Sequence, residues 1–193
     1  MIINKKDIIF AAICGLLVSW LAMDFLGRLG LIFVIIFPIL SVLGLWLTTF
    51  WGKKFKFVDE AGRFFLVGAF ADVIDIKVYQ LLFFVLPFST FIKAISFLVA
   101  TLIKYWWNKG WAFFKEGAES KHTPKEILLF FGVTLIGLLL NVASFYFFDK
   151  IETGLEPKLW TEVSIILAAL VAAVWNFLGY KFLVFKDDKF SIV

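Results

Sequence analysis

The stretch LGLIFVIIFPILSVLGLWLTTFW, residues 29–51, decides the fold because it contains no charged side chain. About 20 apolar residues in an α-helix cross a bilayer core that is about 30 Å thick, so the sequence predicts a membrane-spanning helix here. The composition of the whole chain is also that of a membrane protein. Of its 193 residues, 62% are hydrophobic and 18% are charged, whereas soluble domains have about 45–50% and about 25%. This composition excludes a disordered chain, a nucleic-acid-binding module and most soluble enzymes.

Five other apolar segments are long enough, or nearly long enough, to span a bilayer: 8–26, 64–87, 89–107, 127–148 and 160–180. The predicted fold class is therefore an all-α integral membrane protein with six transmembrane helices. We divide the chain into an N-terminal two-helix membrane hairpin, residues 1–57, and a four-helix transmembrane domain, residues 58–193.

Basic residues set the predicted orientation, because short loops rich in Lys and Arg stay in the cytoplasm. Of the 19 Lys and Arg residues, 14 fall on the side that holds both predicted termini and three fall on the other side. Both termini are therefore predicted to be cytoplasmic, in the cytoplasmic (inner) membrane. The loop after the second span contains Lys53, Lys54, Lys56 and Arg63. We interpret such residues chiefly as the orientation signal, with attraction of anionic lipid phosphates as the sharper alternative.

Spans three and four are similar to spans five and six. The third span begins with RFFLVG at 63–68, and the fifth contains LFFGVT at 129–134. This alignment sets Asp75 opposite Asn141. Because each pair of spans returns the chain to its starting side, the two copies would share one orientation, which makes a parallel repeat.

The ends of the two copies match as well. The fourth span closes with Trp-Asn at 107–108, and the sixth closes with Trp-Asn at 175–176. Each pair is followed by an aromatic run that ends at Lys115 or Lys186. The agreement of topology and spacing supports the repeat more than any single matched residue does.

These motifs resemble the GtrA-like family over roughly residues 62–186. The resemblance is carried by RFFLVG with Asp75 and Lys93, by Trp-Asn-Lys at 107–109, and by WNFLGYKF at 175–182. It implies a small four-helix membrane protein of cell-surface polysaccharide synthesis. Some members are thought to flip polyprenyl-phosphate-linked sugars, and the same module occurs as a membrane anchor fused to glycosyltransferases that resemble dolichol-phosphate-mannose synthase.

The chain departs from the family pattern in three ways. It adds the N-terminal hairpin, it has Lys104 one turn before Asn108 where a polar uncharged residue is more usual, and it carries no glycosyltransferase domain. Some family members share such a hairpin, and the sequence leaves three roles open for it: gating, dimerisation or packing.

Charged residues inside predicted spans mark the candidate site. A charge at the bilayer centre costs about 2.5–3.5 kcal/mol, so such residues are paired, face a cavity or act in function. At 100° per residue, Asp72 and Asp75 share one face of the third helix, and Lys77 points almost the opposite way. The predicted substrate-binding residues are Asp72, Asp75, Lys93, Lys104, Asn108, Asn141 and Asn176.

Several of these residues, and Lys77, have plainer interpretations. Asp75 and Lys93 could instead form an interhelical ion pair that fixes packing, and both interpretations stay open. Lys104 can extend to the interface from a helix end. Asn141 and Asn176 could hold helices together. Lys77 could reach the surface or bind the N-terminal hairpin.

The leading functional hypothesis is translocation of a polyprenyl-phosphate-linked sugar across the cytoplasmic membrane, without enzymatic activity. The alternative is a non-transporting anchor or accessory subunit for a polyprenyl-phosphate glycosyltransferase, and a third possibility is a proton-driven small-molecule exporter. No metal is expected, since the chain has one Cys and one His, His122. No cofactor is expected because no cofactor motif is present, and no nucleic acid because of the composition. A glycosyltransferase partner and a homodimer are compatible with the sequence.

Overall fold

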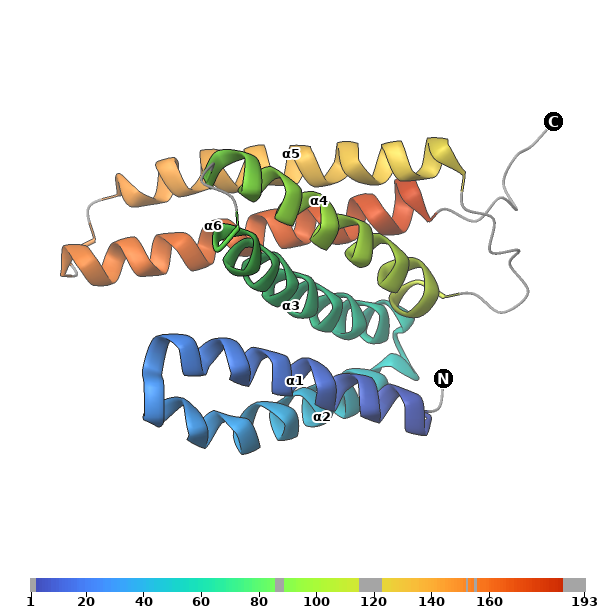
Figure 1. The fold of residues 1–193 in the computed structure, drawn as a ribbon. Coiled ribbons are helices and arrows are strands. Elements are labelled where there is room, and N and C mark those ends of the chain that lie inside the picture. The colour runs from blue at the N-terminus through green and yellow to red at the C-terminus, as the bar shows by residue number, and fades with distance from the viewer. Residues whose placement is uncertain (1–2, 86–88, 115–122, 152, 155, 186–193) are drawn as a thin grey trace. The chain divides into compact units, whose positions relative to one another are not determined.

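The computed structural model describes residues 3–85, 89–114, 123–151, 153–154 and 156–185. Lys115, His122 and Lys186 lie outside these ranges. Within them the chain forms six α-helices (Figure 1): α1 (Lys5–Leu26), α2 (Phe33–Gly52), α3 (Lys56–Phe83), α4 (Ser89–Trp107), α5 (Pro124–Asp149) and α6 (Pro157–Gly179). The all-α class and the six helices are as predicted.

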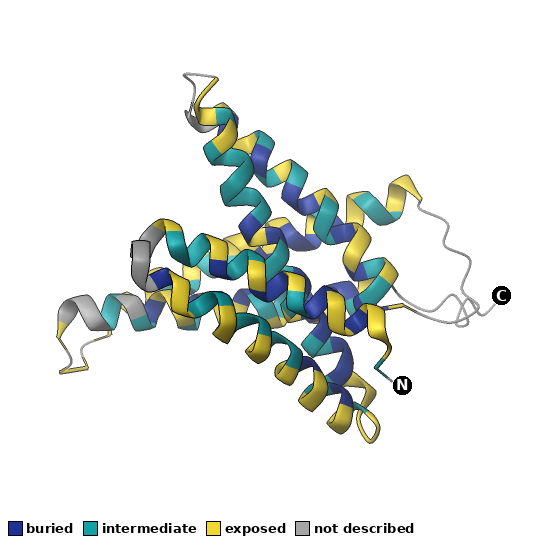
Figure 2. Cartoon of the chain, turned by 60° about the horizontal axis from the view of Figure 1, so that its bottom comes forward, coloured by how far each residue is buried: buried dark blue, intermediate teal, exposed yellow. Residues whose placement is uncertain are grey.

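Four helical segments of the described chain are long and apolar enough to cross a membrane: Lys5–Asp24, Gly30–Gly52, Pro124–Asp149 and Val163–Val184. Large apolar side chains are exposed along them (Figure 2), such as Ile35 at 69% and Leu139 at 62%. Lipid tails accept such surfaces. Helices α3 and α4 are not among the four, because charged side chains interrupt their apolar sequences. That α3 and α4 also cross the membrane stays a prediction, as does the orientation of the termini.

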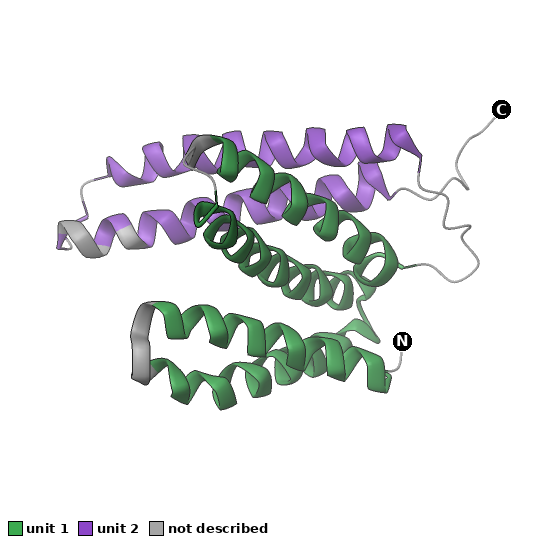
Figure 3. Ribbon diagram, viewed as in Figure 1, with its two compact units in different colours: residues 1–118 green, residues 119–193 purple. Residues whose placement is uncertain are grey.

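The chain forms two compact units, residues 1–118 and 119–193 (Figure 3). The first unit contains α1 to α4, and the second contains α5 and α6. A boundary between residues 57 and 58 stays a prediction about domain organisation.

In the first unit, α1 and α2 form a hairpin that packs on α3. The two helices come close together where Gly15 lies against the backbone of Pro38, and a Cβ atom at Gly15 would overlap it. Glycine permits this approach because it has no side chain. Helix α4 runs antiparallel to α3, since Lys93 contacts Asp75 while the Phe113 ring, after α4, lies 6.3 Å from the Phe64 ring near the start of α3.

In the second unit, α5 begins at a cap and packs along α6. The Thr123 side chain accepts a hydrogen bond from the backbone N–H of Glu126 at 3.2 Å, which satisfies one free donor of the first turn. The indole N–H of Trp175 donates to the carbonyl of Val133 at 3.0 Å, and the hydroxyls of Thr134 and Tyr180 lie 2.7 Å apart. These bonds fix how α6 sits on α5.

Both units contain a π-helical turn after their last helix, α4 in the first unit and α6 in the second. One spans Asn108–Ala112 and the other spans Tyr180–Val184. Each turn begins at a fully buried residue, and each is closed by the N–H of a Phe that donates 2.8 Å to that residue's carbonyl. Short π segments often occur at functional positions. The first π turn begins at Asn108 itself, whereas the second begins at Tyr180, one helical turn after Asn176.

Candidate functional site

An ion pair between α3 and α4 lies at the centre of the predicted site. The Lys93 ammonium is 2.5 Å from Asp75 Oδ2, and the Ser96 hydroxyl donates to Asp75 Oδ1 at 2.6 Å. Ser96 is fully buried, whereas the Lys93 side chain is 54% exposed within the described structure. Asp75 is therefore held on a buried side by Ser96 and on an open side by Lys93.

Ser96 is a residue that the sequence analysis missed. Its spacing from Lys93 is the signal that could have found it, because residues three apart share a helix face. A hydroxyl there offers a donor to any carboxylate that the neighbouring lysine binds.

Asp72 and Lys104 continue the row of charges along the same helix pair. Asp72 interacts electrostatically with Lys104, Asp75 and Lys93. The Lys104 ammonium also lies 5.9 Å from the centre of the Phe64 ring. At a rise of about 1.5 Å per residue, the two lysines are about 16 Å apart along α4. Positive groups thus flank two carboxylates over about half the thickness of a bilayer core.

Asn108 adds a buried hydrogen-bond acceptor at the Lys104 end of this row of charges. Its side-chain amide donates to the Lys104 carbonyl at 2.8 Å, but its Oδ1 atom has no hydrogen-bond partner in the described part of the chain. Asn108 is fully buried. A buried polar atom without a partner is rare in proteins and calls for an explanation such as a ligand or a water molecule.

The second unit has a similar acceptor. Asn176 Oδ1 also lacks a partner among the described residues, and its carboxamide lies against Gly137 of α5. Asn141 is half-buried on α5. The predicted residues thus fall into two groups. Asp72, Asp75, Lys93, Lys104 and Asn108 come together between α3 and α4, and Asn141 and Asn176 belong to the second unit.

Lys77 binds the N-terminal hairpin, which was one of the two alternatives for it. Its ammonium pairs with Asp24 at the end of α1 and lies 4.1 Å from the centre of the Trp20 ring. The Gln80 amide donates to the same Asp24 carboxylate at 3.2 Å. Lys77 therefore stabilises the contact between α1 and α3 and is not part of the row of charges between α3 and α4.

Arg63 is buried, and its interpretation as a loop residue that only signals orientation is incomplete. Its side chain is 1% exposed and donates to Asp7 Oδ1 at 3.0 Å and to Asp59 Oδ2 at 3.1 Å. The Trp111 indole N–H donates to Asp7 at 2.7 Å, and the Thr49 hydroxyl donates to Asp59 at 2.6 Å. This network joins α1, α2, α3 and the first π turn. Sequence reasoning missed it because its members are far apart in the chain.

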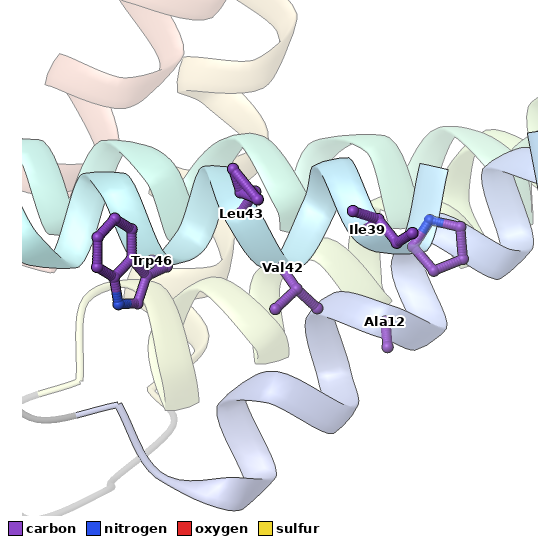
Figure 4. Close-up of a pocket in the computed structure, with 6 residues that line it drawn as sticks. Ala12, Ile39, Val42, Leu43 and Trp46 are labelled. Carbon is purple, nitrogen blue, oxygen red and sulfur yellow. The ribbon is translucent and has the colours of Figure 1, made fainter. Parts of the chain in front are cut away.

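An apolar groove lies on the hairpin, away from the charged row (Figure 4). Its lining is Ala12 from α1 and Pro38, Ile39, Val42, Leu43 and Trp46 from α2. It contains none of the predicted site residues. Among the described residues, no group of three or more His, Cys, Asp and Glu side chains is placed to hold a metal ion.

Comparison with known families identifies the four-helix part of the chain. The model of the family described as GtrA/DPMS, transmembrane domain, matches residues 63–187. No solved structure matches the chain. The family match begins at Arg63 and leaves α1 and α2 before it, which confirms the resemblance read from the motifs. The family is generally without catalytic activity and is associated with the handling of polyprenyl-linked sugars in surface glycan synthesis. Because the match covers more than half of the chain, this protein belongs to the GtrA/DPMS transmembrane-domain family.

Proposed function

We propose that this protein moves a polyprenyl-phosphate-linked sugar across the cytoplasmic membrane for surface polysaccharide synthesis or glycosylation. The observation that carries the proposal is the open Asp75–Lys93 pair on α3 and α4, with Lys93 54% exposed. Because the Lys93 ammonium is open on one side, an anionic headgroup can reach it, which a pair enclosed on all sides would prevent. Family membership supplies the substrate class.

In this proposal the two lysines bind the phosphate in succession. Lys93 and Lys104 act as cationic point charges near opposite ends of the row. When Lys93 turns to the phosphate, Asp75 keeps the hydrogen bond from Ser96, so its charge is not left without a partner. The long, flexible lysine side chain makes this exchange inexpensive.

The sugar would bind the acceptors of the same row. Hydroxyl groups donate to the carboxylates of Asp72 and Asp75 and to the unpartnered Oδ1 of Asn108. Asn141 and Asn176 offer the same kind of acceptor in the second unit. The isoprenoid chain would stay in lipid, which costs nothing because both are apolar.

Transport by the purified protein tests this function. The full chain is reconstituted in liposomes that carry a labelled polyprenyl-phosphate hexose in the outer leaflet, and protection from an impermeant reagent is followed over time. We expect faster protection than in empty liposomes and its loss in Asp75→Asn and Lys93→Ala. Lys125→Ala, which removes an exposed lysine of α5, is the matched control and should transport normally. Wild-type rates in both site variants would exclude the α3–α4 path.

The second candidate is a non-transporting anchor for a polyprenyl-phosphate glycosyltransferase. It is favoured by the complete pairing of Asp75, whose two oxygens are bound by Lys93 and Ser96 as a structural ion pair requires. It predicts no acceleration in liposomes with several sugars tested and a stable complex with the glycosyltransferase on co-purification. A homodimer is compatible with either function, and cross-linking in the membrane would detect it.

A further inference from the structure

Two segments that are distant in the chain meet at one end of the first unit. Asp7 at the start of α1 and Asp59 of α3 bind the same guanidinium, that of Arg63, and Thr49 at the end of α2 donates to Asp59. The first turn of α1 therefore lies beside the turn between α2 and α3. Together these segments carry five exposed lysines, which we call the basic cap: Lys5, Lys6, Lys53, Lys54 and Lys56.

At the basic cap the negative side chains are buried and the lysines are exposed. The nearby carboxylates point inward, since Asp7 is 4% exposed, Asp59 is 3% exposed and Glu60 is 8% exposed. Two of them are bound by Arg63. Glu60 lies 3.8 Å from the Lys56 ammonium, whose side chain is 69% exposed. The charged groups that remain exposed in segments 3–7 and 52–63 are all lysines.

Aromatic rings alternate with the lysines in the turn after α2. The sequence FWGKKFKF, residues 50–57, exposes Phe50, Trp51 and Phe55 by 52–57%. The Lys53 ammonium lies 6.0 Å from the Phe50 ring and the Lys54 ammonium 5.4 Å from the Phe55 ring. Of these rings, Trp51 is of the type enriched at the level of lipid headgroups.

The basic cap lies at the ends of two candidate membrane spans, where lipid headgroups are expected. One candidate membrane span begins at Lys5, and the next ends at Gly52, directly before Lys53. All five lysines therefore flank apolar spans without an intervening domain. Clusters of four to eight basic residues beside a span attract anionic lipids.

We propose that the basic cap is a binding surface for the headgroups of anionic phospholipids in the bilayer. The lysines bind the lipid phosphates, the rings insert among the glycerol and upper acyl groups, and the buried carboxylates keep the surface free of negative charge. This inference does not depend on transport of a sugar lipid.

Lipid retention by the full chain tests the proposal. The protein is purified in neutral detergent, mixed with equal amounts of phosphatidylglycerol and phosphatidylcholine, and the bound lipids are counted by native mass spectrometry. We expect preferential retention of phosphatidylglycerol, which falls at least about fivefold in the double variant Lys53→Gln/Lys54→Gln. The matched control is Lys125→Gln/Lys150→Gln, which removes the same charge from exposed positions of α5 and its end and should retain the wild-type preference.

Three results with the lipid mixture at constant salt would overturn the proposal. They are equal retention of the two lipids by the wild type, an equal loss of preference in the control pair, or full displacement of the lipid by millimolar inorganic phosphate, which would indicate a site for a soluble anion. A salt titration of the wild type covers the case in which the double variant is misfolded. Retention of phosphatidylglycerol must weaken as salt screens the lysines, and retention that is insensitive to salt would contradict an electrostatic surface.

Discussion

The guanidinium of Arg63 contacts the carboxylate of Asp7 at 3.0 Å, although the two residues are 56 positions apart. Arg63 is the first residue of the family match, and Asp7 belongs to the hairpin that precedes it. Both side chains are nearly inaccessible. The hairpin therefore supplies one of the two carboxylates that neutralise a buried charge of the family domain.

Removing the Asp7 carboxylate should destabilise the first unit strongly. Asp7→Ala leaves Arg63 with Asp59 alone, and breaking a buried pair from one side costs about 3–5 kcal/mol. We expect a clearly lower thermal midpoint in detergent. Asp149→Ala, at an exposed end of α5, is the control and should change the midpoint little. Equal midpoints for the two variants would mean that the network adds no stability.

Gly15 should be sensitive to the smallest side chain. Gly15→Ala places a methyl group on the Pro38 backbone, which cannot move aside as a flexible side chain could, and should lower stability by about 1–3 kcal/mol. Gly44→Ala in α2 is the matched control, because a Cβ atom there meets nothing within 4 Å. Thermal unfolding of both variants, measured by tryptophan fluorescence, checks this. Similar midpoints would show that the hairpin is packed less closely than the structure has it.

The second unit offers the same comparison within one helix. Gly137→Ala should push against the Asn176 carboxamide, a side chain that must turn aside, and lower stability by about 1 kcal/mol. Gly132→Ala, also in α5, adds a methyl group with nothing within 4 Å and should be tolerated. Limited proteolysis of the two variants measures the difference. If Gly132→Ala is the more readily cleaved variant, the α5–α6 interface is assigned to the wrong face of α5.

Asn108 separates stability from transport. Asn108→Leu removes an oxygen that has no partner and loses one amide hydrogen bond to the Lys104 carbonyl, so stability should change by only about 1 kcal/mol. Under the proposed function, transport of the sugar lipid should still fall, because a sugar hydroxyl loses its acceptor. Thermal unfolding and the liposome assay are run on the same preparation. Normal transport in a stable Asn108→Leu protein would remove Asn108 from the site.

The π turns suggest a different register for the proposed repeat. If the turns at Asn108 and Tyr180 are equivalent, Lys104 corresponds to Asn176, and the two Trp-Asn pairs are not equivalent positions. The unusual lysine would then stand where the second unit has an asparagine whose Oδ1 lacks a partner. This register is a proposal, and reciprocal Lys104→Asn and Asn176→Lys exchanges in the transport assay would test it.

The sequence by itself determined the class of this protein and its family. Apolar runs such as residues 29–51 predict membrane helices because burial in lipid depends on the sum of side-chain hydropathies along a short stretch. The motifs at 63–68 and 175–182 were enough to indicate the family. The summed hydropathy could not establish α3 and α4 as membrane spans, since the charged side chains in these two helices lower that sum. It left open whether those charges pair across the helices or bind a substrate, and in the structure Asp75 and Lys93 lie in contact.

Only the tertiary structure decided which partner each charge has. Lys77 binds Asp24 rather than reaching the surface, Ser96 shares Asp75 with Lys93, and Arg63 is buried against a helix outside the family domain. The physical reason is that the free energy of a charge in a protein interior depends on groups within a few ångströms of it. Those groups come from helices tens of residues away, and close approaches such as Gly15 on Pro38 set where they lie.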